Sequence, residues 1–197
     1  MSSKLLRLTS LEAFTEPFPY FTATAGFGGV VSSAILEWLE NEAPWNLVET
    51  DFYEQYEFSL VDARLPRPLM FLAERPSLED LRAKVERVLG GRLGERIDCT
   101  AHKLVQGQRI RIHNDCIPGG ETHRVLIQLN RGWFDDQGGY LMLFNSQEPS
   151  DVHKVFPPVN GSVVGFAISK NSNHAVSTVH VGERFTLVFS FYGNDNG

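Results

Sequence analysis

Cysteine is scarce in this sequence, and a leader segment is not apparent. Only two cysteines, Cys99 and Cys116, occur among the 197 residues, and their spacing fits neither a disulfide framework nor a zinc site. A reducing compartment suits two such free thiols. The opening segment MSSKLLRLTSLEAFTEPFPYF lacks the continuous apolar core and small-residue cleavage site of a signal peptide. We therefore expect a cytoplasmic protein.

Long apolar runs and runs of Lys and Arg are missing as well. No stretch has about 18 consecutive apolar residues, the length that indicates a membrane-spanning helix. Lys and Arg total 18 against 24 Asp and Glu, which gives a formal net charge of -6. Nucleic-acid binding relies on clustered cations that neutralise phosphates. We therefore expect neither a membrane nor a nucleic acid as partner, and the sequence leaves the oligomeric state open.

The pattern of the sequence changes near residue 97, from helical segments to short β-type segments. The length suits one domain over residues 1–197. Residues 1–97 contain two helical patterns, SSAILEWLENE and PSLEDLRAKVERVLGG, and an aromatic-rich stretch between them that predicts an irregular strand or two. We interpret this half as helical support and a substrate-lid region.

Residues 98–193 are predicted to form the core of a barrel. Short β-type segments follow one another, with turn signals between them: KLVQGQRIRIH, HRVLIQLN, GYLMLFN, GSVVGFAIS, HAVSTVHV and RFTLVFSFY. Strands of this length and spacing predict a sandwich or barrel rather than a parallel sheet. The expected fold class is α+β, with the N-terminal helices buttressing the outside of the barrel.

The stretch RIRIHNDCIPGG, residues 109–120, places an imidazole and a carboxylate two positions apart at the end of a strand. Side chains alternate between the two faces of a strand, so Arg109, Arg111, His113 and Asp115 are expected to share one face. His174 follows a polar turn at the start of another strand. Two imidazoles and one carboxylate on one face of a metal suit a non-haem Fe(II) oxygenase.

The last strand, RFTLVFSFY, adds a candidate anion site. Its apolar side chains are Phe185, Leu187, Phe189 and Phe191, and the opposite face carries Arg184 and Thr186. An arginine that faces the inside of a barrel is costly unless an anion meets it. A guanidinium with a hydroxyl two residues further on makes a fork for a carboxylate.

With these motifs, the sequence resembles the Fe(II)- and 2-oxoglutarate-dependent oxygenase superfamily, and within it the prolyl 4-hydroxylase-like group. The resemblance extends from about residue 101 to 193 and follows the order His113-x-Asp115, VLIQLNRGWFDDQGGYLMLF, VNGSVVGFAIS, His174 and Arg184-x-Thr186. EPFPYF near the start is also similar to the opening of such domains. The resemblance implies a double-stranded β-helix, the jelly-roll or cupin-like barrel.

The resemblance also implies a set of ligands and residue roles. His113, Asp115 and His174 would bind Fe(II). Arg184 would bind the distal carboxylate of 2-oxoglutarate as cosubstrate, together with Thr186. Gln128 occupies the place where relatives often have a tyrosine that bonds the same carboxylate. O2 would be the oxidant, and ascorbate is a candidate reductant. Because Asp115 is present, hydroxylation is expected rather than halogenation.

Substrate residues are less clearly indicated. Arg109, Arg111 and Arg124 are candidates for holding a substrate carboxylate or a peptide backbone, and solvated strand ends are the alternative. Residues 49–68 are the candidate lid, because substrates of such domains often meet the loops before the first barrel strands. Cys116 and the remaining histidines are interpreted as surface or packing residues. These histidines are His102, His123, His153 and His180.

The leading functional hypothesis is hydroxylation of an aliphatic C–H in a prolyl, peptide or amino-acid-like substrate, with 2-oxoglutarate converted to succinate and CO2. One alternative is a cupin-like metalloenzyme that does not use 2-oxoglutarate. Another is a non-catalytic barrel that serves as a binding module. The sequence leaves the substrate, the position and stereochemistry of oxidation, and the choice between hydroxylation, desaturation and cyclisation undecided.

Overall fold

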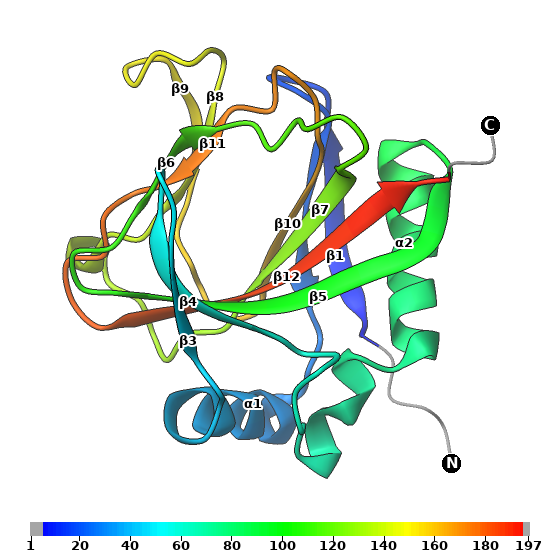
Figure 1. Cartoon of the computed structure of the whole chain (residues 1–197), viewed down its shortest axis with the longest axis vertical. Helices are drawn as coiled ribbons and strands as arrows, with labels where there is room; N and C mark the ends of the chain where they lie inside the picture. The colour runs from blue at the N-terminus through cyan, green and yellow to red at the C-terminus, as the bar shows by residue number, and fades with distance from the viewer. Residues whose placement is uncertain (1–5, 195–197) are drawn as a thin grey trace.

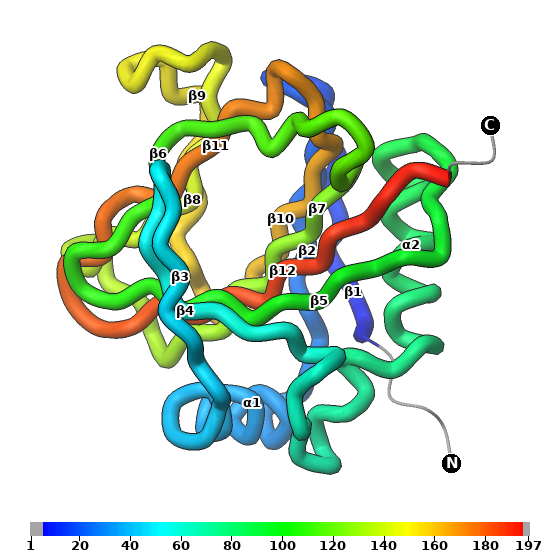
Figure 2. Tube along the Cα trace, in the orientation of Figure 1, coloured from blue at the N-terminus to red at the C-terminus, as the bar shows by residue number. Residues whose placement is uncertain are grey.

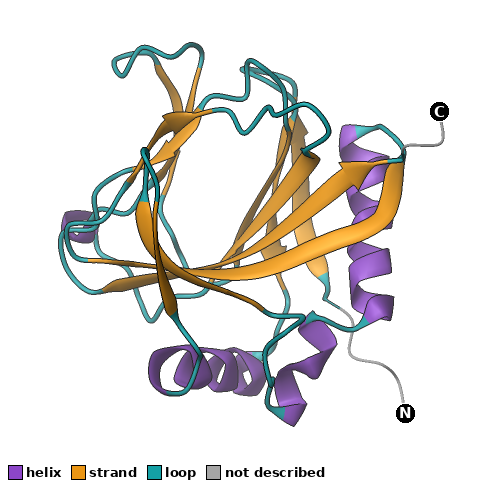
Figure 3. Ribbon diagram, in the orientation of Figure 1, coloured by secondary structure: helices purple, strands orange, loops and turns teal. Residues whose placement is uncertain are grey.

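Two antiparallel sheets face each other and enclose the interior of the barrel, as the computed structural model of the chain shows for residues 6–194 (Figures 1 and 3). The major sheet has eight strands, in the order β1 (Leu8–Phe14), β2 (Tyr20–Ala25), β10 (Ser162–Ala167), β7 (Glu121–Gln128), β12 (Glu183–Gly193), β5 (Leu93–Val105), β4 (Glu54–Ser59) and β3 (Asn46–Glu49). The minor sheet has four, in the order β6 (Ile110–His113), β11 (His174–Val176), β8 (Leu141–Phe144) and β9 (Val152–Phe156). This is the jelly-roll architecture expected from the sequence.

The helices cover the outer face of the major sheet (Figure 1). They are α1 (Gly29–Asn41) and α2 (Arg75–Leu89), with the short 3-10 turn η1 (Arg67–Leu72) between them in the chain. A second 3-10 turn, η2 (Asp135–Gln137), lies apart from these helices, in the connection before β8 (Figure 3). Pro76 fits the first turn of α2, and Gly90 with a φ of 80° ends it. None of the helices in residues 6–194 is both long and apolar enough to cross a membrane.

Alternation along β12 divides the core in two. Phe185, Leu187, Phe189 and Phe191 point outward and pack with the buried faces of α1 and α2. Val188 points inward and packs between the sheets with residues such as Leu126 and Phe166. The predicted assignment of the apolar side chains of this strand to one face is therefore confirmed. Polar Arg184 and Thr186 are left on the inner face, inside the barrel.

The first half of the chain contributes more strand than the sequence indicated. β3 and β4 are the predicted irregular strands, but β1 and β2 were not expected. They extend the major sheet next to β10, and the side chains of β1 are largely exposed. An exposed edge strand carries little hydrophobic alternation, so its sequence gives a weak signal. The N-terminal part is thus both helical support and sheet.

Gly165 provides a test of packing in the major sheet. It lies in β10 opposite Phe21 of β2, and a Cβ added to Gly165 would overlap the ring of Phe21. Phe21 is fully buried. We expect Gly165→Ala to lower the free energy of unfolding by about 1–3 kcal/mol, the usual cost of overpacking. Urea denaturation followed by circular dichroism measures this change.

Gly29→Ala is the matched control, because a Cβ at Gly29 meets no atom within 4 Å. Its midpoint should not fall. An unchanged urea midpoint for Gly165→Ala would contradict the packing described here.

Candidate active site

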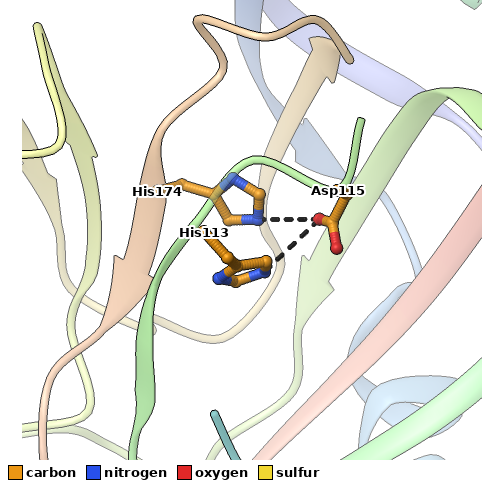
Figure 4. A group of neighbouring side chains, drawn as sticks. All are labelled: His113, Asp115 and His174. Carbon is orange, nitrogen blue, oxygen red and sulfur yellow. Dashed lines mark ion pairs between the residues drawn. The ribbon is translucent and has the colours of Figure 1, made fainter. Parts of the chain in front are cut away.

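Two histidines and one aspartate converge at the end of the minor sheet (Figure 4). His113 is the last residue of β6 and His174 the first of β11, and the two are paired in the sheet register. Asp115 follows β6 after one residue. Its Oδ2 lies 3.4 Å from His113 Nε2 and 3.1 Å from His174 Nε2. The three ligand atoms lie within 4.8 Å of one another, which suits one shared metal ion.

Backbone carbonyls fix the orientation of both imidazoles. His113 Nδ1 lies 2.8 Å from the carbonyl oxygen of Arg111, and His174 Nδ1 lies 2.8 Å from that of Ser172. A carbonyl oxygen only accepts, so each Nδ1 carries the proton and each Nε2 presents a lone pair to the centre of the group. Burial lowers the pKa of His174 below its ordinary value, which keeps the ring neutral. A neutral imidazole with a free Nε2 is the form that binds metal.

Asp115 reaches the group from a loop rather than from a strand. Its φ is +56°, a left-handed backbone conformation that aspartate tolerates better than most residues. The loop is held by Asn114, whose Nδ2 donates to the carbonyl oxygen of Lys170 and whose Oδ1 accepts from the backbone N–H of Cys116. Burial alone would raise the pKa of the Asp115 carboxyl, but the adjacent Arg124 guanidinium holds its pKa well below its usual range.

The expectation that Arg109 and Arg111 share the face of His113 is wrong. Val176 of β11 pairs with Ile110, and His174 pairs with His113, so β6 contains one residue more than β11 over this stretch. This bulge breaks the alternation, because an extra residue moves the following side chains to the other face. Ile110 lines the cavity beside His113, whereas Arg109 and Arg111 are exposed and line a separate outer groove.

A cavity of about 170 Å³ lies between the sheets and contains the histidine and aspartate side chains at one end. Arg184 and Thr186 of β12 lie in its wall. Arg184 is 3% exposed, its Nη1 donates to Thr186 Oγ1 at 2.8 Å, and Thr186 Oγ1 donates to Gln128 Oε1 at 2.9 Å. The predicted trio of Arg184, Thr186 and Gln128 is thus one hydrogen-bonded group.

The charge of Arg184 has no counter-ion in the described part of the chain. Within residues 6–194 no carboxylate lies within ion-pair distance of it, and its buried Nε has no hydrogen-bond partner. Burial lowers the pKa of Arg184 to about 9. A buried cation with an unused donor is a site for an anion, because an unpaired charge in a protein interior is otherwise strongly unfavourable. The residues therefore fit a carboxylate of 2-oxoglutarate.

The paired glycines of the GWFDDQGGY stretch make room for this arginine. Gly139 has a φ of +68°, and a Cβ there would lie 3.0 Å from Arg184 Cδ and 3.2 Å from the ring of Trp133. Trp133 in turn donates its Nε1–H to the carbonyl oxygen of Gly138. The Trp and Gly-Gly positions of the motif thus shape the wall behind the anion site, a role beyond that of a turn.

His102 and Gln55 line the cavity, although the sequence did not indicate them. His102 lies beside Thr186 in the pairing of β5 with β12. Burial, together with the nearby cations Arg124 and Arg184, lowers the pKa of His102 to about 3, so its ring is neutral. Gln55 Nε2 donates to Glu57 Oε2, and Gln55 Oε1 is buried without a hydrogen-bond partner among the described residues. His102, interpreted from the sequence as a surface or packing residue, thus lies in the wall of the cavity.

The predicted strand boundaries leave His102 just outside a strand, so its neighbours in the sheet could not be predicted. The sequence pattern predicts one strand over residues 103–113, whereas β5 ends at Val105 and a turn separates it from β6. Other histidines, His123, His153 and His180, lie outside the cavity, as expected. Cys116 is exposed and is also outside it.

Only the first part of the predicted lid, residues 49–68, lies at the cavity. The turn between β3 and β4 lies beside β6 (Figure 2). It places Phe52 with its ring centroid 5.0 Å from that of His113, and Tyr53 forms a β-bridge with Ile110. Both aromatic residues line the cavity. Leu60, by contrast, belongs to the core beneath the helices, so the later residues of the segment cover a different face.

Arg124 lines the cavity, but its charge is already engaged. Its Nη1 lies 2.6 Å from Asp115 Oδ2, and its Nη2 pairs with Glu121 Oε1. Of the three arginines predicted to bind substrate, Arg124 is thus the one beside the metal ligands, and it is not free to pair with a substrate carboxylate.

Comparison with known proteins gives a family and a fold. Residues 99–191 match the family model described as the 2OG-Fe(II) oxygenase superfamily. The chain is similar in structure to a prolyl 4-hydroxylase from Pseudomonas putida, with a TM-score of 0.67 and 19% identity over 84% of this chain and 86% of that one. No curated protein matches the sequence.

Two further solved structures share the architecture. A prolyl hydroxylase from Trichoplax adhaerens, in complex with a peptide fragment of the hypoxia inducible factor oxygen degradation domain, has a TM-score of 0.71 and 17% identity over 88% of this chain and 83% of that one. A prolyl 4-hydroxylase from Phytophthora capsici has a TM-score of 0.66 and 24% identity, over 90% of this chain and 59% of that one. Taken together, these findings show that residues 99–191 are a 2OG-Fe(II) oxygenase domain, which carries the histidine–aspartate–histidine group, and that the chain has a prolyl 4-hydroxylase-like fold.

Proposed function

We propose that this chain is an Fe(II)- and 2-oxoglutarate-dependent hydroxylase that acts on an aliphatic C–H of a prolyl or other peptide residue. The observation that carries the proposal is the buried Arg184, which has no counter-ion among the described residues, in the same cavity as two imidazoles and a carboxylate. A cation that requires an anion, next to a set of ligands for a metal, fits a carboxylate cosubstrate bound to an iron centre.

His113, Asp115 and His174 would hold Fe(II). With the metal bound, O2 and 2-oxoglutarate supply the oxidation: succinate and CO2 form, one oxygen atom goes into succinate, and the other replaces C–H with C–OH in the substrate. Arg184, Thr186 and Gln128 would orient the distal carboxylate of 2-oxoglutarate through the hydrogen-bonded group described above. The fork of a guanidinium and a hydroxyl matches the two oxygens of a carboxylate.

The apolar walls of the cavity would exclude water from the reacting atoms. Leu126, Leu141, Val176 and Val188 line the space between the metal end and Arg184. Phe52 and Tyr53 stand at the histidines from the turn between β3 and β4. An environment with little water strengthens the contact between the Arg184 guanidinium and a bound carboxylate.

A peptide is favoured over a free amino acid by the position of the arginines. Arg124 is engaged by two carboxylates, so the cavity offers no second free cation for a substrate carboxylate among its described lining residues. Arg109 and Arg111 line an outer groove, which Phe52 and Tyr53 also line. We propose that this groove contacts residues that flank the reacting one. The Trichoplax adhaerens neighbour, which was solved with a peptide, supports this choice.

The metal and cosubstrate can be tested without a known substrate. An anaerobic titration of the metal-free chain with Fe(II) and then 2-oxoglutarate should produce the visible charge-transfer band of an iron-chelated keto acid. The band should require both additions, and His174→Ala should abolish it because one of the three ligands is lost. Tight binding of another metal with no band would instead favour a cupin-like metalloenzyme.

The role of Arg184 predicts a separate change. Arg184→Gln removes one partner of a buried charge pair, so 2-oxoglutarate binding should weaken by about 2 to 4 kcal/mol. This corresponds to roughly 30- to 1,000-fold in Kd, measured from the same band. Metal affinity in the absence of 2-oxoglutarate should not fall, because Arg184 is a cation and not one of the three proposed ligands.

Arg131→Gln is the control, because Arg131 is an exposed arginine that pairs with Glu40 away from the cavity. Unchanged 2-oxoglutarate affinity in Arg184→Gln would remove Arg184 from the cosubstrate site.

The choice of peptide as substrate is tested by turnover. Succinate formation should rise above its basal rate with prolyl-containing peptides and should not rise with free proline or other free amino acids. Arg111→Gln should raise the KM for such a peptide and leave the basal rate unchanged, since Arg111 lies outside the cavity. Stimulation by a free amino acid alone would favour the metabolite alternative.

A further inference from the structure

Asp115 differs from the two histidines in how its position is fixed. His113 and His174 belong to paired strands, whereas Asp115 follows the end of β6 in a left-handed conformation. Strand hydrogen bonds therefore do not fix its backbone, and the direction of its carboxylate depends on side-chain contacts. A metal ligand on a loop needs such support, because binding requires the ligand atoms to be held near their final geometry.

Arg124 provides a contact from a rigid element. It lies in β7, where its backbone pairs with Phe166 of β10 on one side and with Ser190 of β12 on the other. A strand with a neighbour on each side is among the least mobile parts of a sheet. From this strand Arg124 Nη1 donates to Asp115 Oδ2 at 2.6 Å, the same oxygen that faces both imidazoles.

Glu121 holds the other edge of the guanidinium. Arg124 Nε donates to Glu121 Oε2 at 3.1 Å, and Nη2 donates to Glu121 Oε1. The side chains of Asp115, Glu121 and Arg124 are only 15%, 15% and 17% exposed, so solvent screens these contacts weakly. A planar guanidinium bound by both oxygens of one carboxylate has a fixed direction, which a lysine could not reproduce.

We infer that Glu121 and Arg124 act as a clamp that positions Asp115 for metal binding, with Glu121 orienting Arg124 and Arg124 orienting the carboxylate. The inference rests on the metal site proposed above. It also changes the interpretation of Arg124, from a substrate-binding residue to a positioning residue of the metal centre.

Simple electrostatics gives the opposite expectation, which makes the clamp testable. A guanidinium beside a divalent metal repels it, so on charge alone the removal of Arg124 should tighten metal binding. A positioning role requires the removal of Arg124 to weaken binding instead. Loss of an outer partner of a metal ligand typically costs about 10- to 100-fold in metal affinity.

Co(II) is a suitable probe, since its absorption bands report binding and ligand geometry without turnover. Titrations would compare the metal-free wild-type chain with Arg124→Met, Arg124→Lys and Glu121→Gln. We expect a loss of about 10- to 100-fold in Co(II) affinity for both Arg124 variants and a smaller loss for Glu121→Gln. The Lys variant keeps the charge and loses the fork, so its weakening would be specific to geometry.

Glu40→Gln is the matched control. Glu40 accepts from Arg131 Nε with both carboxylate oxygens, at 2.8 and 3.0 Å, but far from the candidate site on the outside of the molecule. Its Co(II) affinity should equal that of the wild type. The double variant Glu121→Gln with Arg124→Met should bind no more weakly than Arg124→Met alone, because Glu121 acts through Arg124.

Each result decides between these accounts, provided that near-ultraviolet circular dichroism shows a folded variant. Unchanged or tighter binding in Arg124→Met overturns the clamp. If that variant does not fold, the Lys and Gln variants decide in the same way. Additive losses in the double variant overturn the relay through Arg124. A wild-type chain that binds neither Co(II) nor Fe(II) overturns the metal site itself, whereas wild-type binding with unaffected variants overturns the clamp alone.

Discussion

The candidate site depends on one backbone pairing, that of β6 with β11. This pairing brings together His113 and His174, which are far apart in the sequence, and sets their ring centroids 4.2 Å apart. The extra residue in β6 between Ile110 and His113 is part of the same device. It turns Ile110 and His113 toward the cavity and directs both neighbouring arginines outward. A regular strand here would have placed additional positive charge beside the metal ligands, which would oppose metal binding.

The two sheets divide the chemistry between them. The minor sheet and its loops carry the candidate metal ligands His113, Asp115 and His174, and the major sheet carries Arg184 and Arg124. Their relative position is fixed by the apolar layer that joins them and by backbone contacts at the edge. There the N–H of Arg111 donates to the carbonyl oxygen of Phe52, which links β6 to the turn between β3 and β4. The spacing of metal and anion sites is thus a property of the barrel and not of any single loop.

The sequence predicted the parts of this site that depend on local pattern. The strand alternation of β12 separates Arg184 and Thr186 from four phenylalanine and leucine side chains, and the structure confirms it. The proximity of His113, Asp115 and His174 was predicted from residue types and strand ends, together with the family resemblance. Register cannot be predicted in this way, because a bulge of one residue leaves no mark in the hydrophobic pattern.

The neighbours of His102 and Arg124 could not be predicted from the sequence, for one shared reason. His102 lies beside Thr186, and Arg124 lies beside Asp115, only because of which strands are neighbours. Nothing in the local sequence distinguishes either residue from a histidine or arginine that faces solvent on a strand. Strand order in an antiparallel sheet is a long-range property, so partners of this kind are visible only once the pairing is known. The sequence pattern did not predict edge strand β1 for a separate reason, which is that its side chains are mostly exposed.

Charge balance connects the two ends of the cavity. Arg184 and Arg124 carry two positive charges, and the two carboxylates paired with Arg124 carry two negative charges, so these four side chains sum to zero. A divalent metal alone would raise this sum to +2, and a dicarboxylate alone would lower it to -2. Either imbalance is costly where burial limits screening. Binding of both would restore zero, so in the proposed function the metal and the cosubstrate would each favour binding of the other.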